Sequence, residues 1–222
     1  LADADLEVTA RRLAWGKGLN AGQTCVAPDH LLVVPEVREP LVAALKREFE
    51  RLYGPDPLTS PDLGAIVNEQ RFGHLSGLLE RAAGRVLAGG QTDPARRRIS
   101  PTLIAVEDPD HDPLMQEELF GPLLPLVMVA DLEEALQRVR LGAKPLALYL
   151  FSRSRGAQER LLATTSSGSV AFNDVVLQAG MVNLPFGGVG ASGMGAYHGE
   201  TGFRTFSHRR SVVSRPFRFD LP

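Results

Sequence analysis

The chain has 222 residues, of which 44% are hydrophobic and 23% are charged, and its formal net charge is −2. This composition is that of a globular protein, and the length suffices for one sizeable core. Without an excess of positive charge the chain has little to neutralise phosphates or anionic lipid, so we expect no nucleic acid as a partner. No apolar run approaches the roughly 20 residues that span a bilayer, so we expect no membrane segment.

Cys25 is the only cysteine in the chain. It cannot form an intramolecular disulfide, which fits a reducing compartment, so we expect a cytoplasmic protein. One cysteine and 5 scattered histidines give no paired ligand spacing, so we expect no metal site. The sequence starts at Leu1 in what reads as a helix entry, without an initiator methionine, and we expect a fragment of something longer.

The first predicted helix covers residues 7–18, where apolar residues recur at helical spacing behind an aspartate that can cap it. An apolar run at 31–34 predicts a buried strand, since it ends at a proline. Helices are then predicted over 37–53 and 70–83. The later predicted strands are 85–88, 101–106, 123–129, 146–151, 169–172 and 211–215, and the later predicted helices are 132–141 and 155–164.

Strands that alternate with helices of ten or more residues are typical of one class of fold. We predict an α/β fold with a largely parallel sheet and helices on both faces. Gly188, Gly190 and Gly193 fit the G-x-G-x-x-G pattern of dinucleotide-binding loops. Only about thirty residues follow them, too few for the rest of a βαβ unit, so we interpret these glycines as shaping a tight loop.

Cys25 falls in a polar turn between the first predicted helix and the first predicted strand. A lone cysteine is more often a small buried hydrophobic residue than a nucleophile. Its position on a glycine-containing connection at the edge of an α/β sheet favours a reactive role, because such folds carry reactive groups there. None of the histidines lies in a known cysteine-protease signature, so a Cys/His hydrolase has no support from the sequence.

Four segments, taken in order, are similar to those of the aldehyde dehydrogenases. They are residues 15–29 (WGKGLNAGQTCVAPD), 115–122 (MQEELFGP), 144–149 (KPLALY) and 184–210, which contains LPFGGVG, SGMGAYHG and TFSHRR. The ending VGASGMGAYH resembles the class 3 enzymes and their bacterial relatives. Four motifs in order and at family-like spacing make a chance match implausible.

The resemblance implies an aldehyde dehydrogenase catalytic domain over residues 1–200 and a C-terminal segment, 201–222, that joins an oligomerisation sheet. It implies that Cys25 attacks a small-molecule aldehyde, forms a thiohemiacetal that gives hydride to NAD or NADP, and leaves a thioester for water to hydrolyse. The Cys25 N–H would be one oxyanion donor, and the partner would be a second copy in a homodimer. The implied site residues are Glu118 and Phe120 at the nicotinamide ribose, and Asn173 and Phe186 in the substrate funnel.

In the family, three parts of the site precede the cysteine: the glutamate that activates water, a side-chain amide of the oxyanion hole, and the Rossmann-like cofactor domain. We therefore expect the N-terminal cofactor-binding domain to be absent and this chain alone to be inactive. Two alternatives stay open. One is an acyltransferase or hydrolase that uses Cys25 without a nicotinamide, and the other is a non-enzymatic truncated copy that serves as a dimerisation module.

Overall fold

The computed structural model describes residues 1–218. Its main sheet has four strands in the order β1-β6-β5-β2, and β7 and β8 form a separate pair. The strands are β1 (Leu31–Val33), β2 (Val86–Ala88), β3 (Thr92–Asp93), β4 (Arg98–Ile99), β5 (Thr102–Val106), β6 (Leu123–Met128), β7 (Ala147–Leu150) and β8 (Ser169–Phe172). The helices are α1 (Leu6–Gly18), α2 (Arg38–Tyr53), α3 (Glu69–Arg81), α4 (Leu132–Leu141), α5 (Arg155–Thr164), α6 (Leu177–Gly180) and α7 (Gly199–Thr205).

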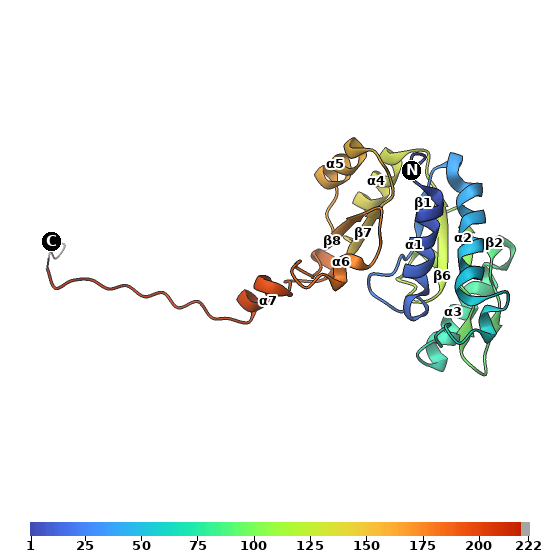
Figure 1. Cartoon of the computed structure of the whole chain (residues 1–222), viewed down its shortest axis with the longest axis horizontal. Coiled ribbons are helices and arrows are strands. Elements are labelled where there is room, and N and C mark those ends of the chain that lie inside the picture. Colours follow the sequence, from blue (N-terminus) through green and yellow to red (C-terminus); the bar gives the residue numbers. More distant parts are fainter. Residues whose placement is uncertain (219–222) are drawn as a thin grey trace.

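Neighbouring residues of the central strands β5 and β6 enter two different cores. Leu103 and Leu124 pack in a cluster with residues of α1 and α2, whereas Ile104 and Leu123 pack in a cluster with residues of α3. Because successive side chains of a strand point to opposite faces, the sheet is buried on both sides. A third, smaller cluster joins α4 and α5 to the β7–β8 pair, which lies beside the main body in Figure 1.

The predicted α/β fold is confirmed, since β1, β6 and β5 pair in parallel and so do β7 and β8. The edge strand β2 is antiparallel to β5, and β3 and β4 form an antiparallel pair outside the main sheet. Side-chain caps fix where several helices begin: Asp5 accepts from Val8 N at 3.2 Å at α1, and Asn68 accepts from Arg71 N at 2.8 Å at α3. Such caps satisfy N–H groups that the first helical turn leaves free.

The predicted strand at 211–215 is wrong. These residues are exposed and form no strand. Figure 1 shows the chain leaving the body after α7 as an extended segment, with no strand of residues 1–218 beside it to pair with. No helix within the same range is both long and apolar enough to cross a membrane.

The predicted tight loop at the glycines is confirmed. A Cβ on Gly188 would lie 2.0 Å from the Ser192 carbonyl oxygen, so the backbone folds back closely on itself there. Gly190 and Gly193 have φ angles of 63° and 143°, which side-chain-bearing residues rarely adopt. These glycines therefore shape the loop between α6 and α7.

Candidate active site

Cys25 lies in the turn that connects α1 to β1, and it is exposed. A hydrogen bond of 2.9 Å from Ala27 N to Thr24 O closes the turn, so Cys25 and Val26 are its two central residues. Within residues 1–218 the backbone N–H of Cys25 donates to no acceptor. An accessible thiol beside a free N–H is the arrangement that a thiolate nucleophile and an oxyanion donor require.

The backbone before this turn is left-handed over three residues. Asn20, Ala21 and Gly22 have φ angles of 51°, 53° and 74°, and for a non-glycine residue this conformation costs roughly 1–2 kcal/mol. At Gly22 a Cβ would lie 2.2 Å from the Gly121 carbonyl oxygen. The backbone just before the Cys25 turn therefore packs directly against the backbone of the loop that carries Glu118.

The side chain of Gln23 ties the turn to a segment more than 40 residues away. Its amide nitrogen donates to Ala65 O at 3.0 Å, and its amide oxygen accepts from Val67 N at 2.9 Å. The Asn20 side chain in turn donates to Gln23 O at 2.9 Å. Contacts of this kind hold an otherwise unfavourable backbone conformation in place.

Glu118 and Phe120 are exposed on either side of Leu119, whose side chain is fully buried. Arg71 donates to the carbonyl of Glu118 at 3.1 Å and also to that of Leu119. From the other side, Leu119 N donates to the Asp29 carboxylate at 3.0 Å. The loop backbone is thus fixed at successive peptide groups, while the two side chains predicted to hold a cofactor stay accessible.

Lys17 is the buried charge behind this loop, with 1% of its surface exposed. Burial lowers the pKa of Lys17 to about 8, against the opposing pull of the negative charges of Asp29 and Glu118. Burial, together with the Asp29 charge, raises the pKa of Glu118 above its ordinary value. Lys17 and Asp29 precede and follow Cys25 in the sequence, and the charges of both act on Glu118.

The structure brings Glu118 and Phe120 together on one loop but places Asn173 and Phe186 elsewhere. The Asn173 amide joins the ends of β7 and β8, because it accepts from Ser152 N at 2.8 Å and donates to Ser152 O at 3.0 Å. Phe186 is half-buried, pairs with Tyr197 through two backbone hydrogen bonds of 2.9 Å, and stacks on His198 at 5.6 Å between ring centroids. A role for Asn173 and Phe186 in a substrate funnel stays a prediction.

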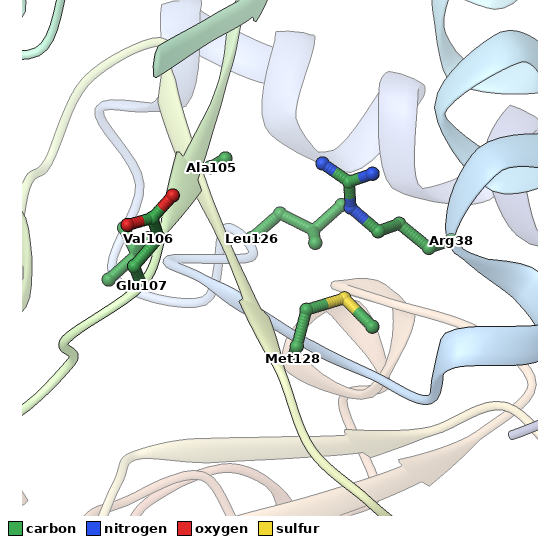
Figure 2. A pocket seen from close by; sticks show the side chains of 6 residues that line it. All are labelled: Arg38, Ala105, Val106, Glu107, Leu126 and Met128. Atoms are coloured by element: carbon green, nitrogen blue, oxygen red, sulfur yellow. The ribbon is translucent and has the colours of Figure 1, made fainter.

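A hollow of about 340 Å³ lies at the ends of β5 and β6, and Figure 2 shows the side chains that line it. Arg38 from the start of α2 and Glu107 lie on opposite sides of it, with Leu126 and Met128 between them. It contains none of the residues that the sequence singled out, and the Arg38 guanidinium is paired with Glu39. We therefore place no chemistry there. Within residues 1–218 no cluster of His, Cys, Asp and Glu could hold a metal ion.

Sequence reasoning assigned no role to Lys17, Asp29, Arg71 or Tyr149. Lys17 offered a usable signal, because it follows Ala10, Leu13 and Ala14 at the spacing of the buried face of α1. A lysine at such a position indicates a buried charge with a specific environment. The other residues act through contacts with residues far away in the sequence, which no local pattern encodes.

The fold and the site define an α/β protein with a single accessible thiol beside a clamped loop that carries an acidic and an aromatic residue. The aldehyde dehydrogenase family profile matches residues 1–212. The bovine "Aldehyde dehydrogenase, dimeric NADP-preferring" is 48% identical over 214 residues, which are 96% of this chain and 88% of that protein. Human "Aldehyde dehydrogenase family 3 member B1" is 48% identical over 213 residues, which are 96% of this chain and 45% of that protein.

Among solved structures, a substrate-bound state of Staphylococcus aureus AldH superposes with a TM-score of 0.95 at 41% identity, covering 99% of this chain and 48% of that one. The chain therefore belongs to the aldehyde dehydrogenase family. It spans about half the length of several curated relatives that it matches, such as 46% of the rat dimeric enzyme and 45% of the human protein.

Proposed function

We propose that the protein containing this chain oxidises an aldehyde to a carboxylic acid with NAD(P)+, through a covalent intermediate on Cys25. The observation that carries the proposal is the exposed Cys25 thiol with its unpaired backbone N–H, in a turn that follows directly on a glycine packed against the Glu118 loop. Membership of the family supports the reaction class, and the name of the bovine relative, NADP-preferring, supports the cofactor class.

In this proposal Cys25 Sγ, as thiolate, forms a bond to the aldehyde carbon, and the carbonyl oxygen takes up the electron pair. The Cys25 N–H stabilises that oxygen, and protonation gives a thiohemiacetal. The chemistry that NAD(P)+ would supply when bound is acceptance of a hydride from the former aldehyde carbon, and loss of the hydroxyl proton to water then leaves a thioester on Cys25. Water then cleaves the thioester, releasing the acid and the free thiol.

The residues present fit a nicotinamide cofactor. Glu118 and Phe120 are accessible on a loop whose backbone is fixed by Arg71 and Asp29. A carboxylate accepts hydrogen bonds from ribose hydroxyls, and an aromatic ring supplies a flat apolar surface. A fixed loop backbone keeps both groups in position, which favours reactions that depend on orientation.

The domain organisation is part of the same proposal. Residues 1–200 act as the catalytic domain, and the segment 201–222 joins an oligomerisation sheet in a homodimer, with 219–222 lying outside the described residues. The exposed side chains of Val212 and Val213, at 78% and 92%, support a partner for this segment. The bovine relative carries the word dimeric in its name.

We further propose that these 222 residues alone do not oxidise aldehydes. The expected general base and second oxyanion donor precede the cysteine in the family, and losses of these kinds cost about 10²–10⁴-fold and about 10²–10³-fold in rate. The cofactor domain is expected to precede it as well. NAD(P)H formation by the purified 222 residues, above a Cys25→Ala control, would contradict this part.

The test of the function itself uses the protein as its gene encodes it. Absorbance at the NAD(P)H band is followed with a panel of aldehydes for the wild type and for Cys25→Ser, with circular dichroism as a check of folding. We expect the serine variant to lose turnover, because an alkoxide is far harder to form than a thiolate at neutral pH. Wild-type turnover by Cys25→Ser would overturn the proposal. Ester hydrolysis by the wild type with no aldehyde oxidation would favour the acyltransferase or hydrolase alternative.

A further inference from the structure

Tyr149, in β7, reaches the turn that holds Cys25. Its hydroxyl donates to Val26 O at 2.7 Å, and its oxygen accepts from Val176 N at 3.1 Å and from the Gln178 side-chain amide at 3.0 Å. Two N–H groups donate to this oxygen, so the hydroxyl hydrogen is left to point at the Val26 carbonyl. The hydroxyl therefore has its full set of partners, and one of them is the residue next to Cys25.

This hydrogen bond joins parts of the chain that are 123 residues apart in sequence. On one side is Val26, which is 3% exposed and packs in the core beneath α1 and α2. On the other side, the segment after β8 presses on α1, since a Cβ on Gly16 would lie 2.4 Å from a methyl carbon of Val175. The Tyr149 hydroxyl sits where the β7–β8 pair meets the nucleophile turn.

Each residue that donates to the Tyr149 oxygen has an energetically unfavourable feature. Val176 has a φ angle of 67°, which is a genuine outlier for a β-branched residue. Gln178 is buried, and its amide oxygen has no hydrogen-bond partner within residues 1–218. Strained or unsatisfied groups persist where the surrounding structure requires them, and they often cluster at functional sites.

The phenol stays protonated across the neutral pH range. Burial raises the pKa of Tyr149, and negative charge at Cys25 and Asp174 raises it further, against the hydrogen bonds from Gln178 and Val176. A protonated hydroxyl can keep donating to the Val26 carbonyl. The link between β7 and the turn is therefore present at the pH at which a thiolate would work.

We propose that Tyr149 is a positioning residue for Cys25: its hydroxyl fixes the Val26 carbonyl and thereby the turn that presents the thiol and the free N–H. The proposal rests on the proposed function for the statement that the thiol is the nucleophile. Cys25 and Val26 are the two central residues of one turn, so a shift of the Val26 peptide moves the thiol as well. Misplacement of a reacting group by about 1 Å can cost on the order of 10²-fold in rate.

The experiment compares Tyr149→Phe with Tyr53→Phe in the complete protein. Both variants remove one phenol oxygen. The Tyr53 hydroxyl, however, lies against Gly18 and makes no hydrogen bond to the turn. The first readout is hydrogen exchange at the Ala27 amide, which closes the turn. We expect about 10-fold faster exchange in Tyr149→Phe, because a buried carbonyl loses its partner, and no change in Tyr53→Phe.

The second readout is steady-state kinetics. Tyr149→Phe should lower kcat by about 10-fold or more and leave the KM for the cofactor within about twofold, because the Glu118 loop keeps its contacts with Arg71 and Asp29. An unchanged rate of exchange at Ala27, or an unchanged kcat, would overturn the proposal. If Tyr149→Phe does not fold, Gln178→Met takes its place. We expect about threefold faster exchange at Ala27 and an about threefold lower kcat in this variant. Wild-type values of both quantities in Gln178→Met would also overturn the proposal.

The outcome is separable from that of the proposed function. If Cys25→Ser keeps full activity while Tyr149→Phe loosens the turn, the nucleophile assignment is wrong and the link between Tyr149 and the turn stands. If Cys25→Ser is inactive while Tyr149→Phe behaves as wild type, Cys25 stands and the role of Tyr149 is refuted.

Discussion

The turn around Cys25 and the C-terminal segment 207–218 contrast in burial and in secondary structure. The turn is tied to residues far away in sequence, through Gln23 to the segment 65–67, through Gly22 to Gly121 and through Val26 to Tyr149. The C-terminal segment is exposed along its length and forms neither helix nor strand. Long-range contacts thus hold the turn around the thiol.

The energetically unfavourable feature differs between the two regions. At the turn, left-handed backbone at Asn20 and Ala21 is tolerated because the surrounding contacts over-determine it. In the C-terminal segment the unfavourable feature is apolar surface, as at Val212, which is 78% exposed, and Val213, which is 92% exposed. Strained backbone that is held in place is typical of functional sites, whereas exposed apolar surface is typical of surfaces that meet a partner.

Gly22→Ala should have the largest effect on the ordered region. A Cβ there would lie 2.2 Å from the Gly121 carbonyl oxygen, at a φ angle of 74°. Left-handed strain and overpacking together predict a loss of about 3 kcal/mol or more in the free energy of unfolding. The control is Gly73→Ala in α3, where nothing lies within 4 Å of the added carbon, and it should stabilise by roughly 0.5–1 kcal/mol. Equal effects in urea denaturation would refute the tight packing of the turn.

Lys17→Met tests the buried charge behind the Glu118 loop. The pKa of Lys17 is lowered from 10.5 to about 8, so between these values the unfolded chain binds more protons than the folded chain. Stability at this residue therefore rises with pH across that window, by up to about 3 kcal/mol. The methionine variant should lose this rise.

The matched control for Lys17→Met is Lys46→Met, at an exposed lysine of α2. It should follow the wild-type curve of unfolding free energy against pH from 8 to 10.5. Parallel curves for the wild type and Lys17→Met would mean that Lys17 is solvated rather than buried.

Much of the fold could be predicted because its signals are local. The predicted helix 37–53 and the observed α2 (Arg38–Tyr53) differ by one residue, as do the predicted strand 123–129 and the observed β6 (Leu123–Met128). The apolar spacing that fixes such elements is written in neighbouring residues. The predicted strand 211–215 fails for the opposite reason, because a strand exists only when a partner supplies its hydrogen bonds.

The candidate site could be predicted only in part. The position of Cys25 on a glycine-containing connection already favours a reactive role, whereas Glu118 and Phe120 are predicted only from family-like motifs, because no pattern of charge or spacing selects them. The left-handed conformation of Ala21 and the bond from Tyr149 to Val26 come from tertiary contacts. A residue type carries no information on a partner 123 positions away, so these features required the structure.

Glu118→Gln, in the complete protein, should slow hydride transfer by up to about 10²-fold while aldehyde binding changes less, because a cofactor held loosely is misaligned. The raised pKa of Glu118 adds a pH dependence. Cofactor affinity should weaken as the pH falls and the carboxylate becomes protonated, since the protonated carboxyl is the weaker acceptor. Rapid mixing resolves the hydride step. The control is Glu80→Gln, on the exposed side of α3. An equal rate of hydride transfer in Glu118→Gln and in this control would mean that Glu118 does not hold the cofactor.

Val213→Asp should have the smallest effect on folding, with the free energy of unfolding changed by less than about 0.5 kcal/mol. Its effect should appear in association, because a negative charge replaces one of two neighbouring valines in a segment that is proposed to meet a partner. Light scattering is expected to show a dimer for the wild type and a shift toward monomer for the variant. Ser211→Asp adds the same charge without removing apolar surface. A dimer that persists unchanged in Val213→Asp would mean that association uses another surface.

The central claim is that the aldehyde carbon becomes bonded to Cys25, and the most direct test is to identify that bond during turnover. Trypsin releases residues 18–38 as one peptide whose only cysteine is Cys25, so mass spectrometry after a rapid acid quench reports on this thiol alone. With aldehyde and NAD(P)+ together, the peptide should gain the mass of the aldehyde less two hydrogens, which is that of the thioester, and this gain should be absent when the cofactor is omitted. NAD(P)H formation in the first turnovers without any acyl group on this peptide would contradict the account.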